Sequence, residues 1–305
     1  MELGKRIKNR ISCFKINFLP IVKLALKIGG GVFSAFAVVL AFVSLDEMGI
    51  KNVWAKIGLI CGICIFSFLL SSFLVVFILK TNRIWSNGKN KVVAFYGDLM
   101  GLAFPKKAVN GRIVVIPVND AFDTIIDKPS EAISDPLVSE NTLHGSWLKL
   151  FFEKENVDST KLDERVKKNL ELNKITPEVV LKRSEKKRGN LESYPLGTIA
   201  VISGSLGVTY YLLVVSKFDQ YNNAQSSKRD IRNAIDSLID YYDSKGQGEP
   251  IYVPLVGTGS SRAGLSHEQS LKIIKSSVFA SEKVINGSMS IVVYSGDRDK
   301  VSIFN

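Results

Sequence analysis

Two long uncharged apolar runs near the start of the chain constrain its fold more than any other feature. Residues 28–45 and 57–79 contain no charged residue, and both runs are rich in Leu, Ile, Val and Phe. A helix needs roughly 20 residues to cross the apolar core of a bilayer. The second run is long enough alone, and the first is long enough if Lys23 and Lys27 extend toward the interface. We therefore predict a hairpin of two membrane-spanning helices, at about 24–45 and 57–79.

The basic residues gather beside these runs. The net charge is +11, but residues 1–30 and 80–112 each carry a net +6, whereas residues 113–305 come to −1. Cationic flanks stay on the cytoplasmic side of a membrane, so we expect both termini in the cytoplasm. No small-residue cleavage site precedes the connecting loop, which argues against a signal peptide. A basic protein can also be a scaffold for nucleic acid, but the near-neutral charge of residues 113–305 argues against that function.

Small residues within the runs have ordinary explanations. The three cysteines favour a reducing cytoplasm over a disulfide-bonded scaffold. Cys61 and Cys64 have the spacing of metal ligands, but no histidine or acid lies nearby in the apolar run, so we interpret them as membrane-helix residues. Gly29–Gly31 either bend the helix or permit its close packing, or they are simply tolerated in a membrane helix, and both interpretations stay open.

Beyond residue 89 the sequence has the pattern of an α/β domain. Runs rich in β-branched residues alternate with amphipathic segments, which predicts a mixed sheet flanked by helices on both faces. We therefore divide the chain into residues 1–88, with the hairpin, and residues 89–305. The expected strands are Val92–Phe95, Arg112–Val118, Thr198–Ser203, Thr209–Val215, Pro250–Leu255, Ser288–Ser295 and Val301–Phe304. The expected helices are Asn141–Phe152, Ser226–Lys245 and Ser266–Ser281, the last with a capping box of Ser266 and Gln269.

Residues 153–192 form a highly charged interruption of this pattern. Thr160 and Asp163 predict a capping box at the start of a helix there. The basic cluster Lys182–Arg188 has the composition of a loop. It is either a solvated face or a patch directed at phospholipid, and the sequence leaves both open.

A glycine-rich loop, Gly257–Gly264, lies between an expected strand and an expected helix. Such a loop suits an anion, because its backbone N–H groups and the helix dipole favour negative charge. It lacks the Lys-Ser/Thr pair of a P-loop, and Arg262 occupies the third glycine position of a dinucleotide fingerprint. On its own it is as often a structural turn as a phosphate site.

Polar residues follow two other expected strands. Asp98 comes directly after the first, where its carboxylate can accept from an adenine amino group, and Asn119-Asp120 follow the second. Ligands of α/β sheets bind at the carboxyl ends of the strands. The three loops together therefore favour a nucleotide site.

This set of loops, in this order, resembles a macro domain, the ADP-ribose-binding module. The resemblance covers about residues 90–305, with 153–192 as an insertion, and implies a macro-domain-like mixed sheet. It implies that Asp98 reads adenine, that Asn119-Asp120 approach the distal ribose and that the glycine loop wraps the diphosphate. Phe122 either stacks on the ligand or packs into the core, and the sequence leaves both open. The expected ligand-binding residues are Asp98, Leu99, Asn119, Asp120, Phe122, Gly257, Thr258, Gly259, Ser260, Ser261 and Arg262.

The sequence departs from the hydrolases of that family. Their consecutive glycines are replaced by Ala121–Asp127, which contains no glycine, so a close approach of that backbone to the pyrophosphate is not expected. Asp120, Asp123 and Asp127 are nominal candidates for activating water. We expect a sensor without catalytic residues, metal or cofactor, and keep a membrane-tethered ADP-ribosyl hydrolase as the alternative.

Two membrane helices before a macro domain resemble the membrane-anchored effectors of type II Thoeris antiphage systems. The resemblance implies a bacterial inner-membrane protein, a TIR-domain partner that makes an ADP-ribose-derived signal (a histidine conjugate), oligomerisation and membrane disruption.

The remaining candidates are weaker. We expect core or capping roles for His144 and His267. Arg262 either pairs with a ligand anion or is a solvated loop residue, and Tyr294 is a second candidate for the adenine side.

Overall fold

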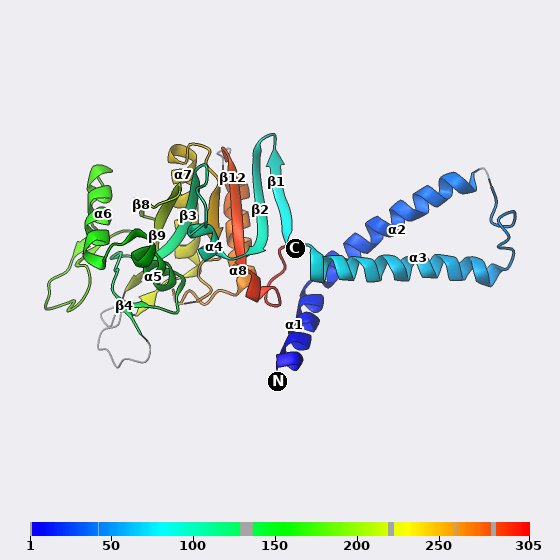
Figure 1. The fold of residues 1–305 in the computed structure, drawn as a ribbon, viewed down its shortest axis with the longest axis horizontal. Helices are drawn as coiled ribbons and strands as arrows, with labels where there is room; N and C mark the ends of the chain where they lie inside the picture. Colours follow the sequence, from blue (N-terminus) through cyan, green and yellow to red (C-terminus); the bar gives the residue numbers. More distant parts are fainter. Residues whose placement is uncertain (1, 42, 129–136, 219–222, 260, 282–284) are drawn as a thin grey trace. The chain divides into compact units, whose positions relative to one another are not determined.

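The computed structural model describes residues 2–41, 43–128, 137–218, 223–259, 261–281 and 285–305. They form two compact units, one of Met1–Asn82 with Gly296–Asn305 and one of Arg83–Ser295 (Figure 1).

The first unit is built on three helices. They are α1 (Glu2–Ile16), α2 (Phe18–Leu40) and α3 (Val53–Phe73), and α3 continues into a π-helical turn, η1 (Leu74–Ile78). Two helical stretches, Phe18–Leu40 and Val53–Ile78, are long and apolar enough to cross a membrane. Each begins several residues before the predicted span, and the first ends at Leu40 instead of 45.

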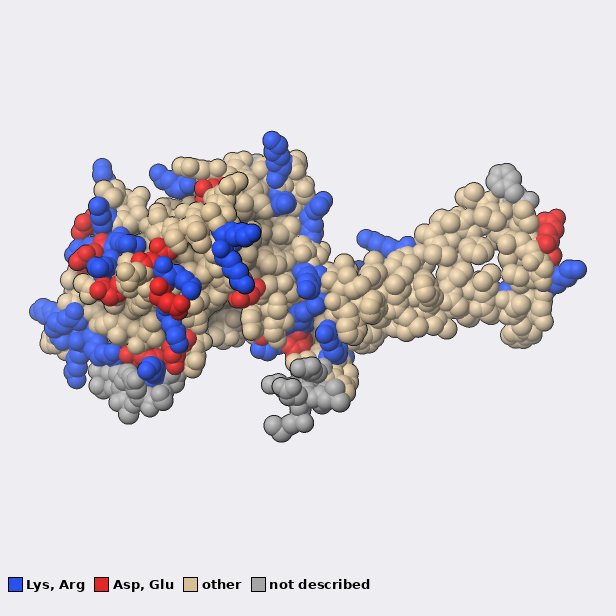
Figure 2. All heavy atoms as spheres, viewed as in Figure 1, with Lys and Arg blue, Asp and Glu red and all other residues tan. Residues whose placement is uncertain are grey.

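The apolar side chains of these two helices are mostly exposed. Only 11% of the most apolar window of α2 and 22% of that of α3 is buried, whereas a core helix of a soluble protein is mostly buried. Figure 2 shows the helical stretches almost free of charged side chains on the face in view. Exposed apolar surface of this extent suggests association with a membrane.

One glycine explains how α2 and α3 pack. A Cβ on Gly29 would lie 3.5 Å from Ser67 Oγ on α3, whereas Gly30 and Gly31 have nothing within 4 Å of that position. Of the two interpretations of this glycine run, close packing therefore applies to Gly29 alone. Cys61 and Cys64 are exposed, and the described residues contain no cluster of potential metal ligands.

The carboxyl-terminal segment packs on the end of α3. Arg298 donates to the carbonyls of Val75 (3.3 Å) and Leu79 (2.7 Å), and Asn82 Nδ2 donates to Ile303 O at 2.6 Å. Phe304 contacts the small core of this unit. The prediction of a strand at Val301–Phe304 is wrong, because these apolar residues form a turn buried in the helical unit.

The second unit contains a mixed sheet with the order β1-β2-β12-β11-β3-β9-β10, and β8 also pairs with β9. Neighbours from β2 to β9 are parallel, whereas β8 and β10 run antiparallel to β9. The strands are β1 (Thr81–Asn87), β2 (Asn90–Gly97), β3 (Arg112–Asn119), β8 (Ile199–Ser203), β9 (Val208–Phe218), β10 (Ala224–Gln225), β11 (Ile251–Pro254) and β12 (Ser288–Tyr294). Two short pairs stand apart, β4 (Ile126–Asp127) with β5 (Val138–Ser139), and β6 (Val179–Val180) with β7 (Glu192–Ser193).

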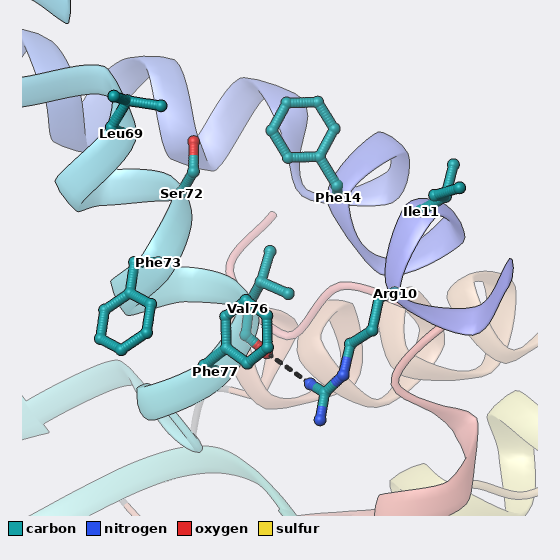
Figure 3. Close-up of a pocket in the computed structure, with 8 residues that line it drawn as sticks. All are labelled: Arg10, Ile11, Phe14, Leu69, Ser72, Phe73, Val76 and Phe77. Atoms are coloured by element: carbon teal, nitrogen blue, oxygen red, sulfur yellow. Dashed lines mark hydrogen bonds between the residues drawn. The ribbon is translucent and has the colours of Figure 1, made fainter. Parts of the chain in front are cut away.

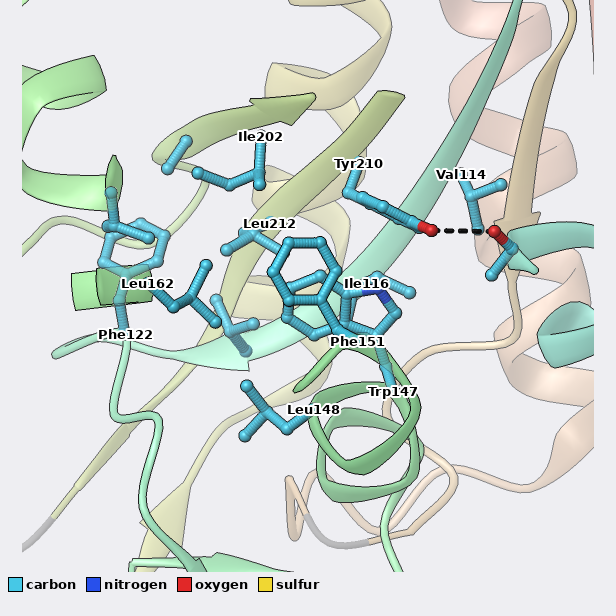
Figure 4. Close-up of a cluster of buried hydrophobic side chains, with 14 of the residues drawn as sticks. Val114, Ile116, Phe122, Trp147, Leu148, Phe151, Leu162, Ile202, Tyr210 and Leu212 are labelled. Carbon is cyan, nitrogen blue, oxygen red and sulfur yellow. Dashed lines mark hydrogen bonds between the residues drawn. The ribbon is translucent and has the colours of Figure 1, made fainter. Parts of the chain in front are cut away.

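Helices cover both faces of this sheet, as predicted. Alternate residues of β3 and β9, such as Ile116 and Tyr210, pack with Trp147 and Phe151 of α5 (Leu143–Glu155) in the core shown in Figure 4. The short α4 (Leu99–Ala103) and α6 (Ser159–Leu172) join this face. On the other face lies α7 (Lys228–Lys245), whose Tyr241 ring meets Tyr211 edge-on at 5.3 Å, and α8 (His267–Ala280) packs beside α7.

The helix starts confirm one prediction and correct another. Ser266 and Gln269 form the expected reciprocal capping box of α8. The predicted start of α6 is wrong, since its N-cap is Asp158, which accepts from Lys161 N at 2.9 Å. Asp163 instead accepts hydrogen bonds from Thr124 and Asn190.

Candidate functional site

The predicted loops lie at one edge of the sheet. Because β2, β12, β11, β3 and β9 are parallel neighbours, their carboxyl ends share an edge, which is where α/β sheets bind ligands. Asp98 follows β2, Asn119 ends β3 and the glycine loop follows β11. Tyr294, the last residue of β12, is 62% exposed at the same edge.

Asp98 has a structural task as well as an exposed position. One carboxylate oxygen accepts from Met100 N at 3.0 Å and caps α4. The side chain is on the surface at the strand end, so a ligand can reach it. Leu99 is buried in the core beneath the edge, so its side chain is not available to a ligand.

The glycine loop is fixed at both ends. Gly257 has φ +85°, and a Cβ there would lie 2.7 Å from Leu265 Cδ1. Leu265 N donates to Gly257 O at 3.2 Å and closes the loop. Ser270, on the second turn of α8, accepts from Val256 N at 2.9 Å. The loop is therefore held against the beginning of α8, as an anion site requires.

The middle of this loop faces outward. Gly259 and Arg262 are exposed and Thr258 is partly exposed, while Arg262 has a left-handed φ of +54°. The hydroxyl oxygen of Ser261 is buried and has no hydrogen-bond partner among the described residues. Ser260, also predicted as a ligand contact, lies outside the described residues.

The loop after β3 is closed by its own hydrogen bonds. Asn119 Nδ2 donates to Asp123 Oδ2 at 3.1 Å, and Asp123 N donates to Asn119 Oδ1 at 3.0 Å. Asp123 is fully buried, and its carboxylate also accepts from Lys186 Nζ at 2.8 Å and from Asn190 N at 2.7 Å. The side chain of Asn119 therefore stabilises this loop through hydrogen bonds to Asp123.

A second ion pair fixes the far end of the same loop. Arg188 donates to both carboxylate oxygens of Asp127, at 2.7 and 3.1 Å, and Leu137 N donates to the same group at 2.7 Å. Lys186 and Arg188 belong to the basic cluster that the sequence presents as solvated or lipid-facing. For these two residues both interpretations are wrong, because each pairs with an acid of the loop.

Asp120 and Phe122 also face inward. Asp120 accepts from Ser193 Oγ at 2.5 Å and Phe218 N at 3.2 Å, and its burial raises the pKa of its carboxyl. Phe122 is 2% exposed at φ +51°, and its ring meets Tyr194 edge-on at 5.6 Å. The expectation that Phe122 stacks on a ligand therefore needs correction, since its ring is part of the core.

The histidines have structural positions. His144 is buried beside Trp147, and burial lowers the pKa of its imidazole to about 3. His267 is the first residue of α8 and partly exposed. Both fit the expected core and helix-start roles.

Comparison with known proteins identifies the family. The family model of the Thoeris protein ThsA macro domain matches residues 95–294, more than half of the chain. The chain belongs to the ThsA macro-domain family. The macro-domain fold predicted from the three loops is thereby confirmed, and the matched region lies within the sheet-containing unit of this ThsA-type chain.

Individual relatives are distant. The Thoeris protein ThsA of Bacillus amyloliquefaciens (strain Y2) is 24% identical over 149 residues, which are 48% of this chain and 44% of that protein. The match thus spans less than half of that relative's length.

Solved structures similar to this ThsA-type chain include macrodomains. The Oceanobacillus iheyensis macrodomain with MES bound has 16% identity and a TM-score of 0.45, covering 73% of this chain and 93% of that one. The same macrodomain with ADP has 14% identity and a TM-score of 0.45, covering 73% and 92%. The Trypanosoma brucei macrodomain in complex with ADP-ribose has 10% identity and a TM-score of 0.38, covering 68% and 65%.

Proposed function

We propose that this chain is a membrane-bound antiphage effector that senses an ADP-ribose-derived nucleotide. Membership of the ThsA macro-domain family supports the ligand class. The observation that carries the proposal is the convergence of Asp98 and the glycine loop on one sheet edge. In this arrangement Asp98 accepts from adenine, the exposed middle of the glycine loop holds the diphosphate, and the loop that begins at Asn119-Asp120 lies on the ribose side.

The hydrogen bonding of the acids supports a sensor over a hydrolase. A general base must reach the water that it activates. Asp123 and Asp127 are paired with Lys186 and Arg188, and Asp120 accepts two internal hydrogen bonds. All three carboxylates thus stabilise the loop. We propose that the chain binds its nucleotide without hydrolysing it.

The exposed apolar helices would anchor the chain in the membrane and disrupt it. We propose that residues 1–88 anchor the chain in the bacterial inner membrane with both termini in the cytoplasm, and that residues 89–305 sense the signal. A TIR-domain protein would make that signal, the histidine conjugate of ADP-ribose. Ligand binding then favours an oligomer whose hairpins disrupt the bilayer and arrest or kill the cell. The ligand shifts this equilibrium only by its differential affinity for the two states.

Calorimetry on the full chain in detergent tests the ligand class. We expect ADP-ribose or its histidine conjugate to bind, and Asp98→Ser to weaken binding by about tenfold through loss of a charged hydrogen-bond acceptor. Serine keeps the capping acceptor of α4, so the variant separates ligand recognition from helix stability. Absence of binding to the wild-type chain would overturn the proposal. Release of ADP-ribose from a modified protein, abolished by Asn119→Ala, would instead support the hydrolase.

A further inference from the structure

A mostly apolar pocket of about 400 Å³ lies in the helical unit, between α1 and the end of α3 (Figure 3). A pocket of this size falls in the range that holds small ligands. Aromatic and aliphatic side chains form most of its wall, and a single guanidinium is its charged group. Its lining residues are Arg10, Ile11, Phe14, Leu69, Ser72, Phe73, Val76 and Phe77.

Helix α1 presents apolar and basic side chains to the solvent together. Ile7 and Ile11 are 54% and 52% exposed one turn apart, and Phe14 follows at the next turn beside the pocket. Lys8 and Lys15 are exposed on the same helix. Amphipathic helices of this composition lie in the interfacial plane of membranes that contain anionic lipid.

Arg10 places a cation at one end of the pocket. Its Nη1 donates to Val76 O at 3.2 Å, and its guanidinium carbon lies 4.6 Å from the centre of the Phe77 ring. In Figure 3 the guanidinium reaches toward Val76 and Phe77, while Phe14 and Leu69 lie farther along the wall. A guanidinium has five N–H donors in a planar fork that matches a phosphate group. Arg10 is exposed and one of those donors serves Val76, so the fork can also bind an anion.

We infer that this pocket binds one anionic phospholipid, with an acyl chain against Phe14, Leu69 and Phe73 and the phosphate on Arg10. Charge complementarity selects this occupant, since residues 1–30 carry seven basic side chains and one acidic side chain. The apolar wall is part of a helix long enough to span a bilayer, so a lipid tail reaches it without crossing water. The inference rests on the proposed membrane embedding and is independent of the nucleotide site.

Native mass spectrometry of the full chain in detergent tests the site. The chain is titrated with phosphatidylglycerol or phosphatidylcholine that carry the same acyl chains, and the first bound lipid is quantified. We expect phosphatidylglycerol to bind about tenfold more tightly, because the choline cation of phosphatidylcholine offsets the attraction of its phosphate for Arg10, whereas phosphatidylglycerol keeps a net negative charge. Arg10→Gln should abolish this preference, and Arg10→Lys should restore part of it. Ser72→Trp, which fills the pocket, should prevent retention of either lipid.

The matched control is Lys15→Gln, which removes one charge from α1 outside the pocket. It should preserve the preference for phosphatidylglycerol. Equal binding of both lipids overturns the site, and equal loss in Arg10→Gln and Lys15→Gln overturns it in favour of diffuse attraction. Flotation of the wild-type chain with vesicles distinguishes failure of the lipid site from failure of the membrane embedding. A chain that floats but shows no preference refutes only the lipid site, whereas a chain that does not float also refutes the membrane embedding.

Discussion

Asp123 and Lys186 show how single residues shape the candidate site. Their side chains are 0% and 5% exposed and 2.8 Å apart, so both charges have lost their water. Removing one partner of a buried ion pair is costly, because the other charge stays buried without compensation. The loop after β3 therefore depends on a residue that lies 63 positions later in the chain.

We predict that Lys186→Met destabilises the sheet-containing unit by about 3 to 5 kcal/mol, the usual cost of breaking a buried pair. Chemical unfolding of the full chain in detergent measures this through Trp147, a core residue, after Trp54 and Trp85 are replaced by Phe. Lys187→Met is the control, since Lys187 is exposed next to it and should change stability little. Equal effects of the two variants would contradict the role assigned to Lys186.

Asp163 predicts a pH dependence. Burial raises the pKa of its carboxyl, so the folded chain holds that proton more tightly than the unfolded chain. Its contribution to stability is then lost as pH rises from the ordinary Asp value of about 4 through the folded pKa. Asp163→Asn keeps an acceptor for Thr124 and Asn190 but cannot ionise. We expect the unfolding midpoint of this variant to fall less above pH 4 than that of the wild-type chain. A pH profile identical to that of the wild-type chain would refute the assignment.

These residue-level contacts were beyond prediction from the sequence. The cluster Lys182–Arg188 contains exposed and buried cations in one short loop, and nothing in its composition separates Lys186 from Lys187. Asp98 and Gly257 could be predicted as site candidates because each lies within three residues of the end of a strand with a clear apolar pattern. Phe122 failed as a candidate since an aromatic residue in a loop is equally suited to stacking and to burial.

At the scale of elements, the glycine loop makes the clearest prediction. Gly257→Ala places a methyl group against Leu265 at a left-handed φ, so the loop must shift, and we expect nucleotide affinity to fall by about tenfold or more. Gly248→Ala is the matched control. It has a similar φ of +76° with nothing within 4 Å of the added Cβ, and it precedes β11 at the opposite edge. Calorimetry that finds equal losses in both variants would show that the loop does not hold the ligand.

Elements with strong periodicity were predicted well. Helix α7 buries the six residues that its sequence places on one face, namely Ile231, Ala234, Ile235, Leu238, Ile239 and Tyr242. Strand β1 was missed, because most of its side chains are partly or fully exposed and it lacks an apolar run. A strand was wrongly predicted at Val301–Phe304, since the apolar residues of this segment are buried against helices instead of in a sheet.

At the scale of the whole molecule, the net charge of +11 is unevenly placed along the chain. The excess lies in residues 1–30 and 80–112, on both sides of the hairpin, and the family match covers the nearly neutral remainder. One chain thus combines a candidate nucleotide site with two exposed apolar helices. We propose that nucleotide binding at this site controls how the two helices act on the membrane.

Dye leakage from vesicles measures that control most directly. The full chain is reconstituted in vesicles that contain a self-quenching dye, and ADP-ribose or its histidine conjugate is added at increasing concentration. We predict that leakage begins in the concentration range in which calorimetry finds binding, and that Asp98→Ser requires about ten times more nucleotide. Saturating binding of the nucleotide by the wild-type chain without any leakage would contradict the account.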